Sequence, residues 1–266
     1  MAVSSSIKRH GGKSYLAAKI RALFAAHTRY CEPFFGSGAV LFAGDGEGVA
    51  EFANDLNGEL MNFWRVLRDT PDRMLHYLWA TPLSKDMFDE ARSNLQNDDR
   101  LKRATAFFIR NRQSRQGLGR DYCTPTSRLR RGMNEQVSAW LSAVDGLPEF
   151  HARLRRVEIR CQEATDLIRE LDAPETLFYC DPPYLHETRI TTTEYGEYEM
   201  TADDHRALLG CLMGIQGKFL LSGYRNDLYD SWADRLGWRR VDFPIPNSAS
   251  SKKVKAVKVE CVWLNY

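Results

Sequence analysis

The sequence predicts an α/β protein in which a mostly helical domain is inserted into a sheet-forming domain. Short apolar runs that suit strands buried on both faces, such as Leu177–Cys180, alternate with helical patterns near both ends of the chain. Between about Asp69 and Arg160, long helical patterns dominate instead. We therefore expect a discontinuous α/β domain, residues 1–68 and 161–266, around an inserted domain, residues 69–160.

The composition is that of an ordinary globular protein. Hydrophobic residues make up 43% and charged residues 27% of the 266 positions. No apolar run approaches the ~20 residues of a membrane span, and the N-terminus lacks the apolar stretch of a signal peptide. The six cysteines form no C-x-x-C pair, so reduced core thiols are expected rather than disulfides or a zinc site. We expect a cytoplasmic protein that uses neither a membrane nor a metal.

The first element expected is a helix that follows a pair of glycines. Leu16 and Ile20 recur with helical spacing after Gly11, Gly12 and Lys13. Glycines at a helix start let the backbone approach a ligand, and the free N–H groups there favour negative charge. Lys13 could add a cation for a carboxylate. Taken alone, such a pair of glycines is usually only a turn.

A strand, a glycine-rich turn and a helix are expected next, over Arg29–Phe42. Gly36 and Gly38 permit a tight turn and a close backbone contact, as in βα turns that hold nucleotides. This turn lacks the lysine of a phosphate-binding P-loop. We therefore expect a nucleoside cofactor with an uncharged tail rather than a nucleoside triphosphate.

The second strand of the predicted sheet, Val49–Asp55, ends in an acid. Asp55 lies about twenty residues after the glycine turn, a spacing at which an acid reaches ribose hydroxyls in nucleoside sites. A helical pattern follows it, so Asp55 could instead cap that helix, and both roles can coexist.

Basic charge gathers in one segment of the predicted insertion. Between Arg100 and Arg131 there are ten Lys or Arg residues and one acid, Asp121, so the segment is about +9 and the rest of the +2 chain about −7. Such clustering predicts contact with a polyanion. The side chains expected to supply both phosphate contacts and paired hydrogen bonds to base edges are Arg110, Asn111, Arg112, Gln113, Arg115 and Gln116. The arginines expected to bind DNA are Arg110, Arg112, Arg115, Arg120, Arg128, Arg130 and Arg131.

The most informative stretch is Asp181-Pro182-Pro183-Tyr184, which follows the apolar run Leu177–Cys180. Prolines cannot continue a strand ladder, so Asp181 is expected at the carboxyl end of a strand, where open α/β sheets bind ligands. Asp181 and the Pro182 carbonyl could together accept the two N–H groups of an exocyclic amine. The ring of Tyr184 could stack on its heterocycle for ~1–3 kcal/mol. The alternative is a loop that merely closes the strand.

Four further elements complete the expected sheet domain. Thr201-x-x-Asp204 reads as a capping box that opens a helix. A buried strand, a helix and a closing strand are expected at Phe219–Ser222, Asn226–Leu236 and Val257–Trp263. Loops are expected at residues 186–200 and 248–258, and we expect the second loop to lie over the polyanion.

Taken in order, these motifs resemble the Dam-like (D12 class) site-specific DNA adenine-N6 methyltransferases, which use S-adenosylmethionine. The resemblance runs nearly end to end. It rests on the Gly-Gly-Lys opening, Glu32-Pro33-Phe34-x-Gly36-x-Gly38, the strand-end Asp55, Asp181-Pro182-Pro183-Tyr184, and the closing Glu260-x-x-Trp263-x-Asn265-Tyr266. It implies a Rossmann-like methyltransferase sheet with an inserted DNA-recognition domain. It also implies methyl transfer to the N6 amino group of an adenine flipped out of double-stranded DNA.

The resemblance further implies residue roles. Asp181, Pro182 and Tyr184 would be catalytic. The residues expected at the cofactor are Arg9, His10, Gly11, Gly12, Lys13, Glu32, Pro33, Phe34, Phe35, Gly36, Gly38, Asp55 and Asp181. Where the family commonly has an aromatic residue two places before the glycine pair, this chain has Arg9, followed by His10. The target sequence is not carried over, because the insertion is the least family-like part. A cognate restriction nuclease is a further partner that such proteins can have.

Three alternatives stay open at this point. Cytosine-N4 methylation also modifies an exocyclic amine, but more often goes with serine in the place of Asp181. Methylation of RNA would need the same basic segment. A DNA-binding relative that has lost catalysis is the third, and the intact Asp181 and Tyr184 argue against it.

Overall fold

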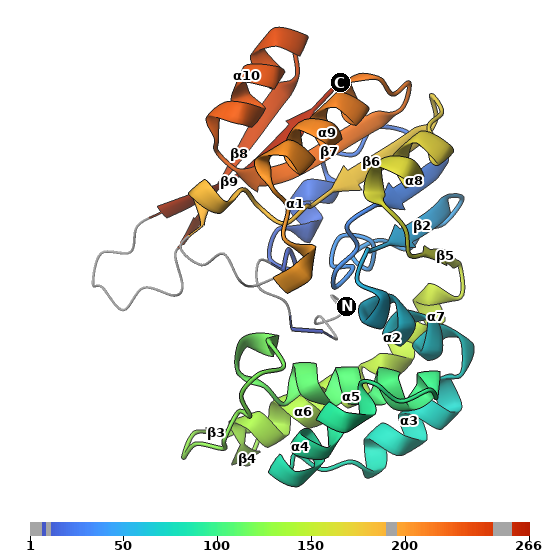
Figure 1. Cartoon of the computed structure of the whole chain (residues 1–266), viewed down its shortest axis with the longest axis vertical. Coiled ribbons are helices and arrows are strands. Elements are labelled where there is room, and N and C mark those ends of the chain that lie inside the picture. The colour runs from blue at the N-terminus through green and yellow to red at the C-terminus, as the bar shows by residue number, and fades with distance from the viewer. Residues whose placement is uncertain (1–6, 9–11, 190–195, 247–256) are drawn as a thin grey trace. The chain divides into compact units, whose positions relative to one another are not determined.

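A computed structural model describes residues 7–8, 12–189, 196–246 and 257–266 of the chain (Figure 1). The predictions for Arg9, His10 and Gly11, and for most of the loop 248–258, lie outside these residues. The chain forms two compact units. The helical unit comprises the described residues within Met1–Leu23, Gly36–Glu47 and Asn57–Cys161. The sheet unit comprises those within Phe24–Phe35, Gly48–Leu56 and Gln162–Tyr266.

The sheet unit contains six strands of a seven-stranded, mostly parallel sheet. They lie in the order β2-β1-β6-β7-β9-β8. Their bounds are β1 Arg29–Glu32, β2 Ala50–Asn54, β6 Thr176–Cys180, β7 Lys218–Tyr224, β8 Arg239–Pro246 and β9 Val257–Leu264. Strands β2, β1, β6 and β7 are parallel, whereas β9 is antiparallel to both β7 and β8. The predicted α/β class and the strands at β2, β6, β7 and β9 are thus confirmed.

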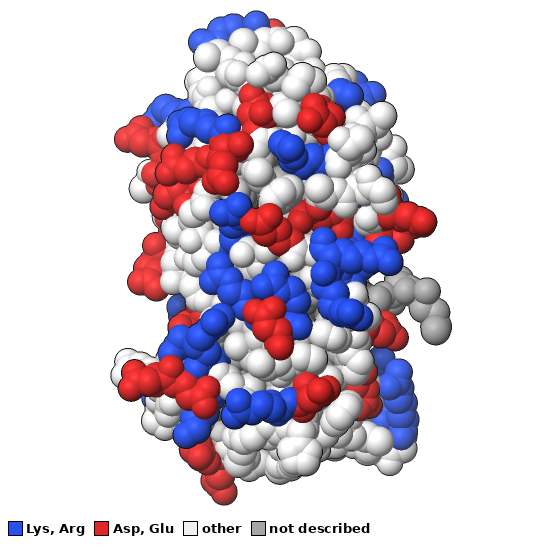
Figure 2. All heavy atoms as spheres, turned by 90° about the vertical axis from the view of Figure 1, so that its right-hand side faces the viewer, with Lys and Arg blue, Asp and Glu red and all other residues white. Residues whose placement is uncertain are grey.

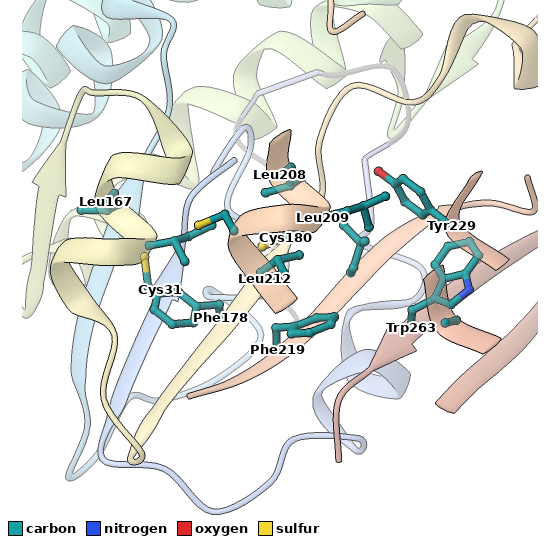
Figure 3. Packing of buried hydrophobic residues seen from close by; sticks show 14 of the residues in the cluster. Cys31, Leu167, Phe178, Cys180, Leu208, Leu209, Leu212, Phe219, Tyr229 and Trp263 are labelled. Atoms are coloured by element: carbon teal, nitrogen blue, oxygen red, sulfur yellow. The ribbon is translucent and has the colours of Figure 1, made fainter. Parts of the chain in front are cut away.

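Strand β6 is buried on both faces, as the apolar run Leu177–Cys180 predicted. Phe178 and Cys180 point to the face covered by α8 (Ala164–Leu171), α9 (Ala202–Met213) and α10 (Asp227–Leu236) (Figure 3). Phe178 lies beside Phe219 of β7 in the strand register and packs with α9 leucines such as Leu209. Each such buried side chain contributes ~1.5–3 kcal/mol, so the core holds the carboxyl end of β6 in place.

The helices over this face begin where the sequence predicts. Thr201 and Asp204 form the reciprocal capping box at the start of α9. Asn226 caps α10 by accepting a hydrogen bond from Tyr229 N at 2.8 Å, and the helix ends at Gly237 with φ of 68°. Two short 3-10 turns, η2 (His186–Thr188) and η3 (Gly196–Tyr198), lie between Tyr184 and α9 in the chain. Capping therefore fixes the residue at which each of the two helices begins.

A fully buried histidine, His205, lies in the first turns of α9. Its Nδ1 is hydrogen-bonded to the Tyr229 hydroxyl at 2.7 Å. Burial lowers the pKa of His205 from 6.5 to about 4, against the opposing effects of Asp204 and the Pro183 carbonyl. The imidazole is therefore neutral in the folded protein at neutral pH.

We expect the free energy of unfolding to fall as the pH drops from about 6.5 towards 4. In that window the unfolded chain binds a proton at His205 that the folded protein excludes, which costs the fold roughly 3 kcal/mol. Urea unfolding at pH 7 and pH 4.5 measures this, with His205→Gln as the variant that cannot titrate. If the variant loses as much stability on acidification as the parent chain, His205 is not the cause.

The helical unit packs seven helices and a two-stranded hairpin. Their bounds are α1 Ala17–Arg21, α2 Gly58–Asp69, α3 Pro71–Ala80, α4 Lys85–Asn94, α5 Arg100–Arg112, α6 Glu135–Asp145, α7 Leu147–Leu154, β3 Leu129–Arg130 and β4 Met133–Asn134. The strand β5 (Val157–Arg160) and the 3-10 turn η1 (Arg115–Gly117) also belong to it. Phe63 of α2 stacks on Phe108 of α5 with centroids 5.5 Å apart, and Phe108 contacts Trp140 of α6. Aromatic packing thus joins the three helices.

Two local expectations were wrong or incomplete. Residues 39–43 form turns rather than the helix expected after Gly38, because a run of glycines follows and Gly46 and Gly48 adopt φ of 65° and 71°. The hairpin β3–β4 was not predicted. Its two-residue turn, Arg131-Gly132, has positive φ at both positions, 55° and 75°, which is the type I′ pattern of tight hairpins.

All six cysteines are unbridged, and four of them are buried. Within the described parts of the chain, no helix is long and apolar enough to cross a membrane. Across the same residues, no cluster of three His, Cys, Asp or Glu side chains could hold a metal ion.

Candidate functional site

Asp181 lies where the sequence placed it, directly after the last residue of β6. Because β6 lies between β1 and β7 in a parallel arrangement, the ends of all three strands share one edge of the sheet. Asp181 is half-buried there and Pro182 is buried. The tetrapeptide therefore stands at the edge where open α/β sheets bind ligands.

The Tyr184 side chain turns inward rather than presenting an open ring. Its residue is only 9% exposed, and its ring meets that of Tyr224 edge to face with centroids 4.8 Å apart. The hydroxyl lies 3.2 Å from Asp181 Oδ1 and donates a short hydrogen bond to Glu260 Oε1. Burial, together with the charges of Asp181 and Glu260, raises the pKa of Tyr184 well above its usual value. The phenol therefore keeps its proton.

Glu260 is the functional candidate that sequence reasoning missed. It is 1% exposed and lies 76 positions after Tyr184. Strand β9 runs antiparallel to β7 and pairs Glu260 with Tyr224, so the start of β9 shares an edge with the end of β7. The sequence offered two signals: Glu260 opens the closing motif of the family resemblance, and it is a charged residue directly before the apolar run Cys261–Leu264.

The segment Glu32–Phe35 is also anchored in the sheet unit. Glu32, 2% exposed, accepts a hydrogen bond from the Tyr30 hydroxyl at 2.8 Å. Buried Asn54 donates to the Pro33 carbonyl at 3.0 Å and accepts from Phe35 N at 2.7 Å through its own backbone carbonyl. The end of β2 thus holds the turn that follows β1.

Asp55, directly after β2, is half-buried. It does not cap the following helix. The N-cap of α2 is Asn57, whose side chain accepts from Leu60 N at 3.0 Å. The capping alternative for Asp55 was therefore wrong, and its position at the end of a parallel strand agrees with the ligand-binding alternative.

The other residues expected at the cofactor belong to the helical unit. Gly36 and Gly38 adopt φ of 52° and 64°, which only glycine takes readily. Gly12 and Ser37 line a pocket of about 290 Å³, shared with Ile7, Lys8, Ser14, Arg112 and Gln116. Lys13 is 3% exposed and is absent from that lining. The cations at the pocket are thus Lys8 and Arg112, and burial lowers the pKa of Arg112 to about 10.

One wall of this pocket is tied to the end of α5. The backbone N–H of Lys8 donates to Asn111 Oδ1 and its carbonyl accepts from Asn111 Nδ2, both at 2.8 Å. Asn111 Nδ2 also donates to the Gly117 carbonyl at 3.0 Å, and Lys8 Nζ donates to the Arg112 carbonyl at 2.9 Å. Lys8 is therefore held by hydrogen bonds to the C-terminal end of α5.

We expect Gly117→Ala to cost ~1–3 kcal/mol more stability than Gly119→Ala. Both glycines have positive φ, 78° and 69°, so an alanine is strained at either position. At Gly117 the new Cβ would also meet the Lys8 Cβ and carbonyl oxygen at 2.5 Å. At Gly119 it would meet nothing nearer than 3.9 Å. Denaturant unfolding of the two variants tests this, and equal losses would exclude the Lys8 contact as the cause.

The seven arginines expected to touch a polyanion do not share one environment. Arg110 is 7% exposed; its guanidinium lies over the Phe88 ring and donates to the carbonyls of Phe88 and Gly119. Arg112 is half-buried and donates to the Ala139 carbonyl at 3.2 Å. Arg110 therefore serves the interior of the helical unit, whereas Arg112 also lines the pocket beside Lys8. The expected base contacts of Asn111 and Gln113 were wrong, because these residues are only 7% and 0% exposed and their amides bond within the unit. The exposed arginines are Arg115, Arg120, Arg128, Arg130 and Arg131.

Three of the exposed arginines belong to the β3–β4 hairpin or lie beside it: Arg128, Arg130 and Arg131. Arg131 occupies the tip with φ of 55°, an unusual backbone conformation for a residue of this size, and donates to Ser142 Oγ at 2.8 Å.

On the face drawn in Figure 2, basic and acidic side chains are interleaved, so neither sign of charge dominates that face.

Comparisons with known proteins agree with one another. Residues 10–243 match the model of the D12 class N6 adenine-specific DNA methyltransferases. A DNA adenine methylase of Vibrio cholerae is 27% identical over 211 residues, covering 76% of this chain and 73% of that protein. The type II methyltransferase M.MjaIII of Methanocaldococcus jannaschii is 26% identical over 233 residues, covering 77% of each. A DNA N-6-adenine-methyltransferase of Escherichia phage P1 is 28% identical over 229 residues, covering 78% of this chain and 28% of that longer protein. With most of its length matched by the family model and its Asp-Pro-Pro-Tyr at the sheet edge, the chain belongs to the D12 class of N6 adenine-specific DNA methyltransferases.

Proposed function

We propose that Asp181 and the Pro182 carbonyl hold the N6 amino group of an adenine flipped out of DNA while S-adenosylmethionine donates the methyl group. The observation that carries this is the position of Asp181, half-buried at the carboxyl end of the buried strand β6 and flanked by Pro182. An adenine inside a duplex cannot reach such a pocket, so flipping must precede transfer, at a cost of a few kcal/mol.

The two acceptors explain how a weak nucleophile can react. The amino lone pair is delocalised into the adenine ring. Hydrogen bonds from both N–H groups to Asp181 and Pro182 would localise it on nitrogen and stabilise the positive charge that develops there. When bound, S-adenosylmethionine supplies a methyl group activated by its sulfonium, so no covalent enzyme intermediate is needed. Alignment of the two reactants supplies much of the rate.

The residues present fit such a cofactor. Asp55 is a strand-end carboxylate that does not cap α2, and we assign it to the ribose hydroxyls. The pocket lined by Gly12, Ser14 and Ser37 offers backbone and hydroxyl groups, with Lys8 and Arg112 as cations, which suits an amino-acid carboxylate. Phe34, half-buried beside the glycine turn, would border the cofactor.

Residues 69–160 would recognise the DNA target. The exposed arginines from Arg115 to Arg131 would contact phosphates, and Arg110 does not belong to this set because its guanidinium is bound inside the helical unit. Stacking of Tyr184 on the flipped base stays a prediction from the resemblance, and the residue is only 9% exposed. A cognate restriction nuclease and a cytoplasmic location remain predictions from the resemblance.

One experiment tests the reaction and its target together. Duplex DNA is incubated with the protein and labelled S-adenosylmethionine. One portion is digested to nucleosides to identify the modified base, and the label is located in the sequence of a second, undigested portion. Label in N6-methyl-2′-deoxyadenosine at a defined sequence is expected. Label in N4-methyl-2′-deoxycytidine would favour the cytosine alternative, and transfer to RNA but not DNA would overturn the assigned substrate.

A further inference from the structure

The Tyr184 hydroxyl lies between two carboxylates but has one proton to donate. The hydroxyl is within hydrogen-bond distance of both Glu260 Oε1 and Asp181 Oδ1, the latter at 3.2 Å, and Glu260 is the nearer of the two. A phenol can satisfy only one acceptor at a time with that proton. The partner that receives it therefore decides how strongly Asp181 can accept from a substrate.

We propose that Glu260 is a positioning residue that takes the Tyr184 proton and thereby keeps this proton from competing with the amino group of the target base for Asp181 Oδ1. The proposal rests on the function assigned above to Asp181. It adds a residue that acts through Tyr184 and touches neither the base nor the methyl donor.

The burial of Glu260 supports a dedicated role. It is 1% exposed and is followed in β9 by four fully buried apolar residues, Cys261–Leu264. A buried carboxylate is costly, and an apolar residue of similar size would often stabilise a core more. The cost is met here by a charge-assisted hydrogen bond from the catalytic loop.

The strand pairing explains how this residue reaches the loop. Glu260 lies opposite Tyr224 in the β7–β9 register, and the Tyr224 ring packs edge to face on that of Tyr184. The ring of Tyr184 is thus held by a residue of β7 and its hydroxyl by a residue of β9. Burial, and after it the charges of Asp181 and Glu260, raises the pKa of Tyr184, so its hydroxyl stays a donor.

Glu260→Gln should therefore damage catalysis in a specific way. The glutamine amide can donate to the Tyr184 oxygen, which turns the phenol proton towards Asp181 and into competition with the substrate. We expect the single-turnover rate of methyl transfer to fall about 10- to 100-fold, the usual range for a lost hydrogen bond to a charged group. The dissociation constants of S-adenosylmethionine and of duplex DNA should change less than about threefold, because neither is contacted.

The decisive comparison repeats this change in a Tyr184→Phe background. Tyr184→Phe alone should lower the rate of methyl transfer, because the phenol no longer positions its neighbours. The same change also removes the phenol proton that would compete with the substrate amino group for Asp181. Adding E260Q to Y184F should then lower the rate no further. The proposal would be overturned if the fold-loss in rate of the double variant equalled the product of the two single fold-losses. It would also be overturned if E260Q alone kept the wild-type rate. If E260Q melts below the assay temperature, Glu260→Asp, which withdraws the carboxylate by one methylene, takes its place in the same comparison.

The same measurements separate this proposal from the assigned function. If the unaltered protein methylates adenine and loses that activity with Asp181→Ala, a multiplicative double variant overturns the role of Glu260 alone. If Asp181→Ala retains its activity, the assignment of Asp181 fails and the role of Glu260 fails with it.

Discussion

Replacing Asp181 by alanine is expected to reduce the single-turnover rate of methyl transfer by at least about 10²–10³-fold, the range seen when one preorganised group is removed from a reacting centre. The loss follows because Asp181 would no longer accept from the amino group, and no other residue of the Asp181–Tyr184 loop carries a carboxylate. Binding of duplex DNA should persist, because the exposed arginines lie on the helical unit. Rapid-quench methylation assays and DNA titrations measure the two quantities.

Two variants control this result. Asp181→Asn keeps one acceptor oxygen and should fall between the parent protein and Asp181→Ala. Asp203→Ala removes an exposed carboxylate of the same unit, whose side chain is 91% exposed and pairs with Arg206, and should leave the rate unchanged. Appreciable turnover by Asp181→Ala would contradict the assigned role.

The second large effect is expected from Arg128, Arg130 and Arg131, changed together to glutamine. Each lost phosphate contact lowers the log–log slope of affinity against salt by roughly 0.9, so the triple variant should lose up to about 2.7 of that slope. Affinity for duplex DNA should fall most at low salt and converge with the parent value as salt rises. Fluorescence anisotropy over a series of salt concentrations measures both.

Arginines of the sheet unit offer a matched control. Arg169 and Arg206 are exposed, with side chains 61% and 56% accessible, and each pairs with an acid three positions away on its own helix. Changing both to glutamine should leave the log–log slope of DNA affinity against salt unchanged. If the hairpin variant keeps the parent slope, the hairpin does not contact phosphate.

Much of the sheet unit could be predicted because its signals are local. The apolar run Leu177–Cys180 predicts a doubly buried strand, and the prolines that follow end it at Asp181. Thr201 and Asp204 encode the start of α9 in four residues. Spacing also led to Asp55, which lies directly after β2, because it follows the glycine turn by about twenty residues.

Other features depend on which segments meet in space. Basic composition alone could not distinguish Arg110, which is buried over Phe88, from Arg131 at the hairpin tip. Whether Arg110 is buried depends on the face of α5 on which it lies and on the packing of α4 against α5. Nor does any local pattern bring Glu260 to Tyr184. That contact requires β9 to pair antiparallel with β7 in the register that sets Glu260 opposite Tyr224. The sequence by itself determined the family, the strand that carries Asp181 and the residues of the loop that follows it. Only the tertiary structure decided that Asp181 and Glu260 meet at the same phenol hydroxyl, because sheet order and strand register are properties of the whole chain.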